Sequence, residues 1–117
     1  MKICITAKGP SLHDEVDPHF GRAAHFLFYD LETGELKAVS NDPGAHGAGV
    51  QAARIVADNG ASVVITGSVG PNAYQGLSAA GVEMYIGAQG TVEEAIAAYR
   101  AGKLTRADRP GGRGHRG

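Results

Sequence analysis

One short segment of the chain combines residue types that could bind an anion or a metal. It consists of His19, Phe20, Gly21 and Arg22, and it directly follows Asp17–Pro18. The proline stiffens the approach to His19, and Phe20 can anchor the loop in the core, so we expect the direction of the imidazole to be fixed. Arg22 supplies a cation beside it. We therefore expect His19 to contact a ligand, either as a metal ligand or as a hydrogen-bond donor.

Glycine is unusually frequent, with 18 among the 117 residues. Two glycine-rich segments, Asn41–Gly49 and Gly67–Asn72, each stand between a predicted strand and a predicted helix. Glycine lets backbone N–H groups come close to a ligand, and the N-terminus of the following helix adds partial positive charge. An anion is therefore the expected ligand. The candidate binding residues in these segments are His46, Gly47, Gly49, Gly67, Gly70 and Asn72.

The sequence lacks the residues that nucleotide-binding sites, two-metal nuclease sites and multi-thiolate metal sites require. The segment Gly67–Gly70 is neither a P-loop nor a dinucleotide fingerprint, and no lysine follows in the P-loop position. Two-metal nuclease chemistry needs several carboxylates, but the corresponding strand positions hold Cys4, Ile5, Phe28 and Thr66. The single cysteine excludes a disulfide within the chain and a multi-thiolate metal site built from one copy. Because Cys4 lies inside a predicted strand, we interpret it as a small core residue.

The elements that must position these residues follow from the hydrophobic pattern. Strands are predicted at Lys2–Ala7, His25–Leu31, Glu35–Ser40, Ala61–Thr66 and Val82–Ile86. Helices are predicted at Val50–Asn59, Ala73–Ala80 and Thr91–Arg100. The last two strands each follow a helix, which implies right-handed crossovers into parallel positions. The simplest α/β arrangement is a five-stranded mixed sheet of order 3-2-1-4-5, with strand 2 antiparallel and helices on both faces. It resembles the ribonuclease H-like motif.

In this topology the candidate binding segments meet at one edge of the sheet. Strands 1, 3, 4 and 5 end at that edge, and strand 2 begins there. Ligands of open α/β sheets bind outside the carboxyl ends of the strands, where the strand order switches. Here the switch falls between strands 1 and 4, so we expect a ligand site at this rim.

Charge and composition limit the classes of function. Residues 103–117 carry five basic side chains and one acidic one, and the net charge of the whole chain is -1, so the rest is mildly acidic. Nucleic-acid-binding domains normally spread Lys and Arg over a folded face, and no stretch approaches membrane-spanning length. We therefore expect neither partner, and a cytoplasmic location because no signal-peptide pattern opens the chain. Residues 1–104 are expected to form one domain and residues 105–117 a disordered basic tail.

Three motifs, taken together, resemble a known family. They are Val16–Arg22 (VDPHFGR), Gly47–Ala53 (GAGVQAA) and Gly67–Ala73 (GSVGPNA). These motifs resemble the dinitrogenase iron–molybdenum cofactor biosynthesis family, and the likeness covers roughly residues 1–104. The resemblance implies a ribonuclease H-like fold without nuclease chemistry. It also implies a non-catalytic protein that binds or carries iron–molybdenum–sulfur cofactor or its precursors.

The resemblance also implies which residues bind. The chain is most similar to small stand-alone members from sulfate reducers, which hold a molybdenum–copper sulfide cluster non-covalently. The family's motif histidine corresponds to His19, and its glycine loops correspond to Gly47–Gly49 and Gly67–Gly70. A cluster of this kind brings its own sulfide and negative charge. It therefore needs N–H donors, a cation and an apolar wall more than a set of thiolates.

The expected cofactor is thus a molybdenum-containing metal–sulfide cluster, of Mo–Cu–S or Fe–Mo–S type, and the identity of the second metal stays open. A partner protein, either a client or a P-loop ATPase, is also expected. Two alternatives to a cluster carrier remain. One is a regulatory or protein-interaction module without a cofactor, and the other is an enzyme that binds phosphate through the glycine loops.

Overall fold

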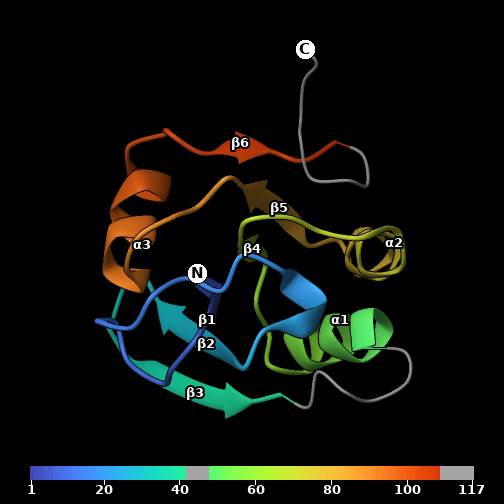
Figure 1. The fold of residues 1–117 in the computed structure, drawn as a ribbon, viewed down its shortest axis with the longest axis horizontal. Coiled ribbons are helices and arrows are strands. Elements are labelled where there is room, and N and C mark those ends of the chain that lie inside the picture. Colours follow the sequence, from blue (N-terminus) through green and yellow to red (C-terminus); the bar gives the residue numbers. More distant parts are fainter. Residues whose placement is uncertain (42–47, 109–117) are drawn as a thin grey trace.

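The computed structural model describes residues 1–41 and 48–108, which form a mixed α/β fold. Within these residues six strands form one sheet in the order β3-β2-β1-β4-β5-β6, and three α-helices pack on it (Figure 1). The strands are β1 (Lys2–Ala7), β2 (His25–Asp30), β3 (Leu36–Ser40), β4 (Val63–Ile65), β5 (Glu83–Ile86) and β6 (Thr105–Arg106). The helices are α1 (Ala48–Asp58), α2 (Pro71–Ala79) and α3 (Val92–Arg100), with a 3-10 turn, η1 (Phe20–Arg22), before β2.

The pairing of the first five strands confirms the predicted order and directions. β1 pairs antiparallel with β2 and parallel with β4. β2 pairs antiparallel with β3, and β4 pairs parallel with β5. Among these five strands only β2 therefore runs against the others. The switch in strand order falls between β1 and β4, at the carboxyl ends of two parallel neighbours.

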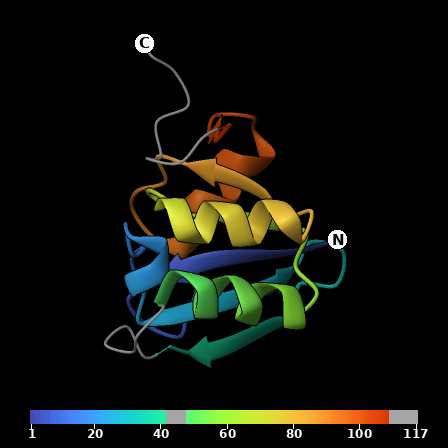
Figure 2. The same cartoon turned by 90° about the vertical axis from the view of Figure 1, so that its right-hand side faces the viewer.

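Alternation of side chains along the strands builds a core on each face of the sheet. Cys4 of β1 lies in register with Phe28 of β2 and Val64 of β4, and this row belongs to the cluster that packs against α1 and α2. Ile5, the next residue along β1, belongs to the cluster that packs against α3. Figure 2 shows α1 and α2 side by side over one face, with α3 beyond the sheet. The prediction of helices on both faces is confirmed.

The sixth strand makes the predicted count of five strands wrong. Thr105 and Arg106 pair antiparallel with the end of β5. The N–H of Ala107 donates a 2.8 Å hydrogen bond to the carbonyl of Met84, and the Ala107 side chain is buried in the core beside α2. Two residues are too few to show an alternating pattern, which is why this strand escapes prediction from sequence. Residues 105–107 of the predicted tail are thus part of the fold, and residues 109–117 lie outside the described residues.

The contribution of this strand can be measured with Ala107→Gly. The change removes a buried methyl group and adds backbone freedom to the unfolded chain, so we expect the free energy of unfolding to fall by about 1–2 kcal/mol. Equilibrium unfolding in urea is the measurement. The matched control is Arg106→Ala, which alters an exposed neighbour and should change stability by less than about 0.5 kcal/mol. Equal effects of the two changes would contradict a buried role for Ala107.

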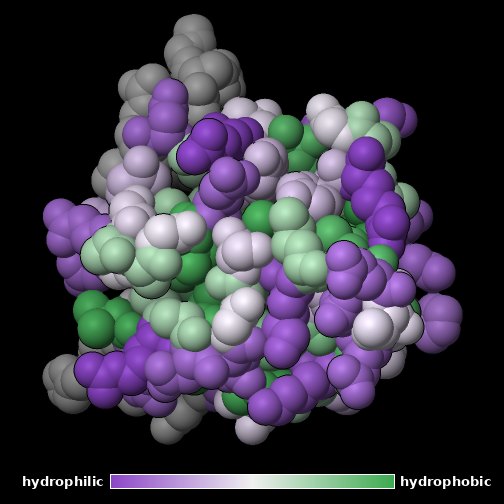
Figure 3. All heavy atoms as spheres, turned by 180° about the vertical axis from the view of Figure 1, so that it is seen from behind, coloured by the Kyte–Doolittle hydropathy of each residue, from purple (hydrophilic) through white to green (hydrophobic). Residues whose placement is uncertain are grey.

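The back of the molecule has a mixed surface. Figure 3 shows hydrophilic side chains interspersed with small hydrophobic areas on this face. In residues 1–41 and 48–108, no helix has the length and apolar character needed to cross a membrane. On the opposite side of the molecule, η1 lies close to the beginnings of α1 and α2 (Figures 1 and 2).

Candidate functional site

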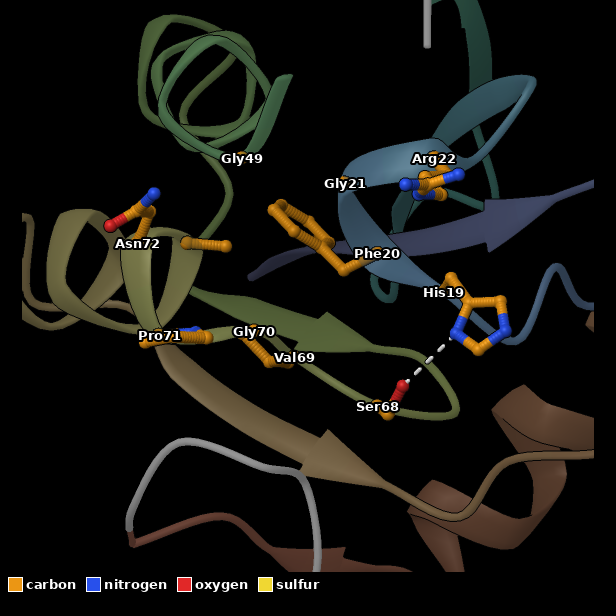
Figure 4. A pocket seen from close by; sticks show the side chains of 11 residues that line it. His19, Phe20, Gly21, Arg22, Gly49, Ser68, Val69, Gly70, Pro71 and Asn72 are labelled. Atoms are coloured by element: carbon orange, nitrogen blue, oxygen red, sulfur yellow. Dashed lines mark hydrogen bonds between the residues drawn. The ribbon is translucent and has the colours of Figure 1, made fainter. Parts of the chain in front are cut away.

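A cavity of about 740 Å³ opens where η1, the start of α1 and the segment between β4 and α2 come together. Figure 4 shows the residues that line it. They are His19, Phe20, Gly21, Arg22, Gly49, Ser68, Val69, Gly70, Pro71, Asn72 and Ala73. The cavity lies beyond the carboxyl end of β4, at the switch in strand order, which is where ligands of open α/β sheets bind.

Seven of the ten residues predicted to bind a ligand line this cavity, that is, all except Gly67, His46 and Gly47. Gly67 lies just before the lining segment, and His46 and Gly47 lie outside the described residues. Four lining residues were missed as binding residues: Ser68, Val69, Pro71 and Ala73. Their position inside the motif of residues 67–73 was the available signal, because a loop that faces a ligand presents consecutive backbone groups to it.

The His19 loop is held against the chain that leaves β4 by a short backbone ladder. The N–H of Ser68 donates to the Pro18 carbonyl at 2.8 Å, and the N–H of Phe20 donates to the Ser68 carbonyl at 3.1 Å. Gly67 permits this approach, because a Cβ atom there would stand 2.5 Å from the Pro18 carbonyl oxygen and 2.8 Å from the Pro18 Cα atom. The missing side chain at Gly67 thus makes room for the backbone of Pro18.

A pair of buried threonines supports the same loop from below. The Thr6 hydroxyl donates a 2.7 Å hydrogen bond to the carbonyl of Asp17 and lies 2.8 Å from the Thr66 hydroxyl. Since Thr6 has one hydroxyl proton, Thr66 is the donor of the second bond. Both side chains have no solvent exposure. The chain just before His19 is therefore tied to the ends of β1 and β4.

The floor of the cavity is apolar. Phe20 and Val69 are each 1% exposed, and Ala73 is 3% exposed. The Phe20 ring packs on Phe26 of β2, with 5.5 Å between ring centroids. Phe20 therefore anchors the loop in the core, as the sequence predicted.

The polar groups of the cavity favour a negatively charged ligand. Arg22 and His19 are exposed on its wall, and no carboxylate lines it among the residues that the structure describes. α2 begins here, and the N–H groups of Asn72 and Ala73 have no hydrogen-bond acceptor in the described residues. Gly70, the N-cap of α2, provides no side-chain cap for them. Free N–H groups at a helix N-terminus bind anions.

A metal ion alone has few protein ligands available. Residues 1–41 and 48–108 contain no group of three or more His, Cys, Asp or Glu side chains that could hold one. Cys4 does not line the cavity and is fully buried, which confirms its interpretation as a core residue. Burial raises the pKa of the Cys4 thiol, so it stays protonated at neutral pH. Among the residues that the structure describes, the cavity therefore offers a metal few protein ligands.

Known proteins share this fold and much of this sequence. The apo form of the orange protein from Desulfovibrio gigas is 42% identical, with a TM-score of 0.88 over 93% of this chain and 94% of that one. A Thermotoga protein, provisionally designated a NifB protein, is 37% identical, with a TM-score of 0.82 over 90% of this chain and 91% of that one. An uncharacterized protein of Methanocaldococcus jannaschii is 31% identical over 109 residues, which is 89% of each chain.

The family comparison agrees with the motifs seen in the sequence. The profile described as "Dinitrogenase iron-molybdenum cofactor" matches residues 1–102, which include all three motifs and five of the six strands. Residues 103–117, which include β6, lie outside the match. The chain therefore belongs to the dinitrogenase iron–molybdenum cofactor family.

Proposed function

We propose that this protein is a non-catalytic carrier that holds a molybdenum-containing metal–sulfide cluster, of Mo–Cu–S or Fe–Mo–S type, non-covalently in the cavity. The observation that carries the proposal is the composition of the cavity wall. In the described part of the chain it combines a cation, helix N–H groups without an acceptor and an apolar floor, with no carboxylate. Family membership and the likeness to the orange protein support the same function.

The lining residues fit such a cluster better than they fit phosphate. A sulfide cluster spreads its negative charge over large, polarisable sulfur atoms, which can lie against Phe20, Val69 and Ala73. Phosphate oxygens concentrate their charge, and desolvating them against an apolar floor without more hydrogen-bond donors is costly. The cluster also supplies sulfide ligands to its own metals, which matches the small number of metal-binding side chains that the described residues place near the cavity.

Further features complete the proposal. The sheet order supports a ribonuclease H-like architecture. We propose that His46 and Gly47, which precede α1, act with the cavity residues, and that the protein works in the cytoplasm. A carrier must exchange its cluster with another protein, so a client or a P-loop ATPase is the proposed partner.

Absorption spectroscopy with metal analysis tests this function directly. Protein purified without oxygen, or incubated with tetrathiomolybdate and copper(I), should show sulfur-to-metal charge-transfer bands in the visible region and retain molybdenum after gel filtration. A colourless protein without retained metal under both conditions would refute the carrier function. Retention of inorganic phosphate in place of thiomolybdate would favour the phosphate-binding alternative.

His19→Ala and Cys4→Ala separate the cavity from the core as the cluster site. His19→Ala should lower the amount of molybdenum retained after reconstitution, because the change removes a polar contact from the cavity wall. Cys4→Ala should leave the visible spectrum unchanged and cost about 1–2 kcal/mol of stability, since it only trims a buried side chain. The opposite pattern, with the spectrum lost in Cys4→Ala and kept in His19→Ala, would place the cluster elsewhere.

A further inference from the structure

The His19 ring rests against Ser68 on the wall of the cavity. Nδ1 of His19 lies 3.4 Å from Oγ of Ser68 (Figure 4). The same oxygen lies 3.3 Å from the carbonyl oxygen of Pro18. The backbone ladder between Pro18–Phe20 and Ser68 holds the two segments in register on both sides of this contact. The Ser68 hydroxyl is therefore placed between a backbone acceptor and an imidazole nitrogen.

Counting protons assigns the direction of these two contacts. A serine hydroxyl has one proton and can also accept. If Ser68 donates to the Pro18 carbonyl, Oγ can accept from an N–H group at Nδ1, and both contacts are hydrogen bonds. If Ser68 instead donates to Nδ1, two oxygen atoms face each other at 3.3 Å with no proton between them. The first arrangement makes hydrogen bonds of both contacts, whereas the second makes only one and leaves the Pro18 carbonyl with the 2.8 Å bond from Ser68 N–H.

We propose that Ser68 is a positioning residue that holds the neutral His19 ring in its Nδ1–H tautomer and leaves the lone pair of Nε2 for the ligand. His19 is exposed, and Nε2 has no hydrogen-bond partner in the part of the chain that the structure describes. The hydrogen bond at one imidazole nitrogen fixes the role of the other, as it does for histidines that bind metals.

This inference rests on the proposed function and makes it more specific. A bare Nε2 can coordinate a metal atom, whereas an Nε2–H group could only donate a hydrogen bond to sulfide. The sequence left these two roles of His19 open. The Ser68 contact selects the first, so His19 is the metal ligand and Ser68 acts through it. The other cluster contacts are then made by Arg22 and the N–H groups that begin α2.

Nitrogen-15 NMR of the imidazole side chains tests the tautomer in protein without any cluster. At about pH 8.5, well above the ordinary imidazole pKa of about 6.5, wild-type His19 should show a protonated Nδ1 and a bare Nε2. Ser68→Ala should return His19 to the mixture of tautomers of an exposed imidazole, and Ser68→Thr should restore the wild-type pattern because it keeps the hydroxyl. Ser78→Ala, an exposed serine of α2, is the matched control and should change nothing.

Reconstitution with tetrathiomolybdate and copper(I) supplies a second readout on the same variants. Loss of a group that orients a metal ligand typically costs about 10–100-fold in affinity, so Ser68→Ala should lose the cluster about that much more readily than Ser68→Thr. A proton on Nε2 in the wild type, or a tautomer that Ser68→Ala leaves unchanged, would overturn the inference. A different result would refute the proposed function alone: the wild type shows the expected His19 tautomer but retains no molybdenum. The two results are separable because the tautomer is measured in protein without the cluster.

Discussion

Gly67→Ala is expected to open the cavity and to lower the free energy of unfolding by about 1–3 kcal/mol, the usual cost of forcing extra volume into a closely packed site. The added Cβ atom would lie 2.5 Å from the Pro18 carbonyl oxygen, and the atoms it meets are backbone atoms that cannot rotate away. The two segments must separate, which breaks the hydrogen bond from Ser68 N–H to Pro18. Urea unfolding and molybdenum retention measure the two effects, and retention should fall by more than tenfold.

Gly70→Ala is the matched control for this change. A Cβ atom at Gly70 would have nothing within 4 Å, and the backbone there is extended, with φ of -73°. Alanine is a poorer helix N-cap than glycine, but it also stiffens the unfolded chain, and these opposing effects are each below about 1 kcal/mol. Gly70→Ala should therefore leave stability nearly unchanged. A similar loss in both variants would show that any larger residue on this rim is disruptive, and that the approach at Gly67 is not special.

Arg22→Glu should release an anionic cluster while the protein stays folded. Arg22 is exposed on the cavity wall, so the substitution disturbs little packing. Two unit charges 4 Å apart in water interact by about 1 kcal/mol, and by more near a protein surface. Reversing the charge removes one attraction and adds one repulsion, which corresponds to at least about a tenfold loss of affinity. Equilibrium dialysis against tetrathiomolybdate measures this loss.

Arg100→Glu is the control, because it makes the same change in net charge at a distant position. Arg100 ends α3, on the other face of the sheet, where its Nη2 contacts the Leu31 carbonyl at 3.4 Å. It should affect thiomolybdate binding much less than Arg22→Glu, and the difference should shrink at high ionic strength, where charges are screened. Equal losses of thiomolybdate affinity in the two variants would show that Arg22 acts only through the net charge of the protein and not through a contact with the cluster.

The strand order could be predicted from sequence because it follows from local signals. β1, β2 and β4 are apolar runs rich in β-branched or aromatic residues, and helices between later strands force parallel crossovers. The rim also follows from topology, so most of the lining residues could be predicted before the structure. β6 could not, because a two-residue strand has no pattern of its own and depends on pairing with β5.

The contacts that hold the His19 loop in place could not be predicted from the sequence for a different reason. Thr6 and Thr66 read as ordinary strand residues, and only the fold reveals that their hydroxyls meet and reach Asp17. Gly67 was predicted to let a ligand approach, yet its missing side chain makes room for Pro18. In both cases the sequence shows the residue type, but the residue that it contacts lies far away along the chain. Only the folded structure brings the two together.

The cavity is built from segments that are far apart in the sequence, so a cluster can bind only after most of the chain has been synthesised and folded. His19 and Ser68 are 49 positions apart, and Thr6 and Thr66 are 60 positions apart. A nascent chain that has left the ribosome only as far as β3 carries the His19 loop but lacks every residue of the opposite wall. The binding site therefore comes into existence with the closure of the sheet, so loading follows folding. Bound cluster should then slow amide hydrogen exchange throughout β1 and β4 and not only in the loops that touch it.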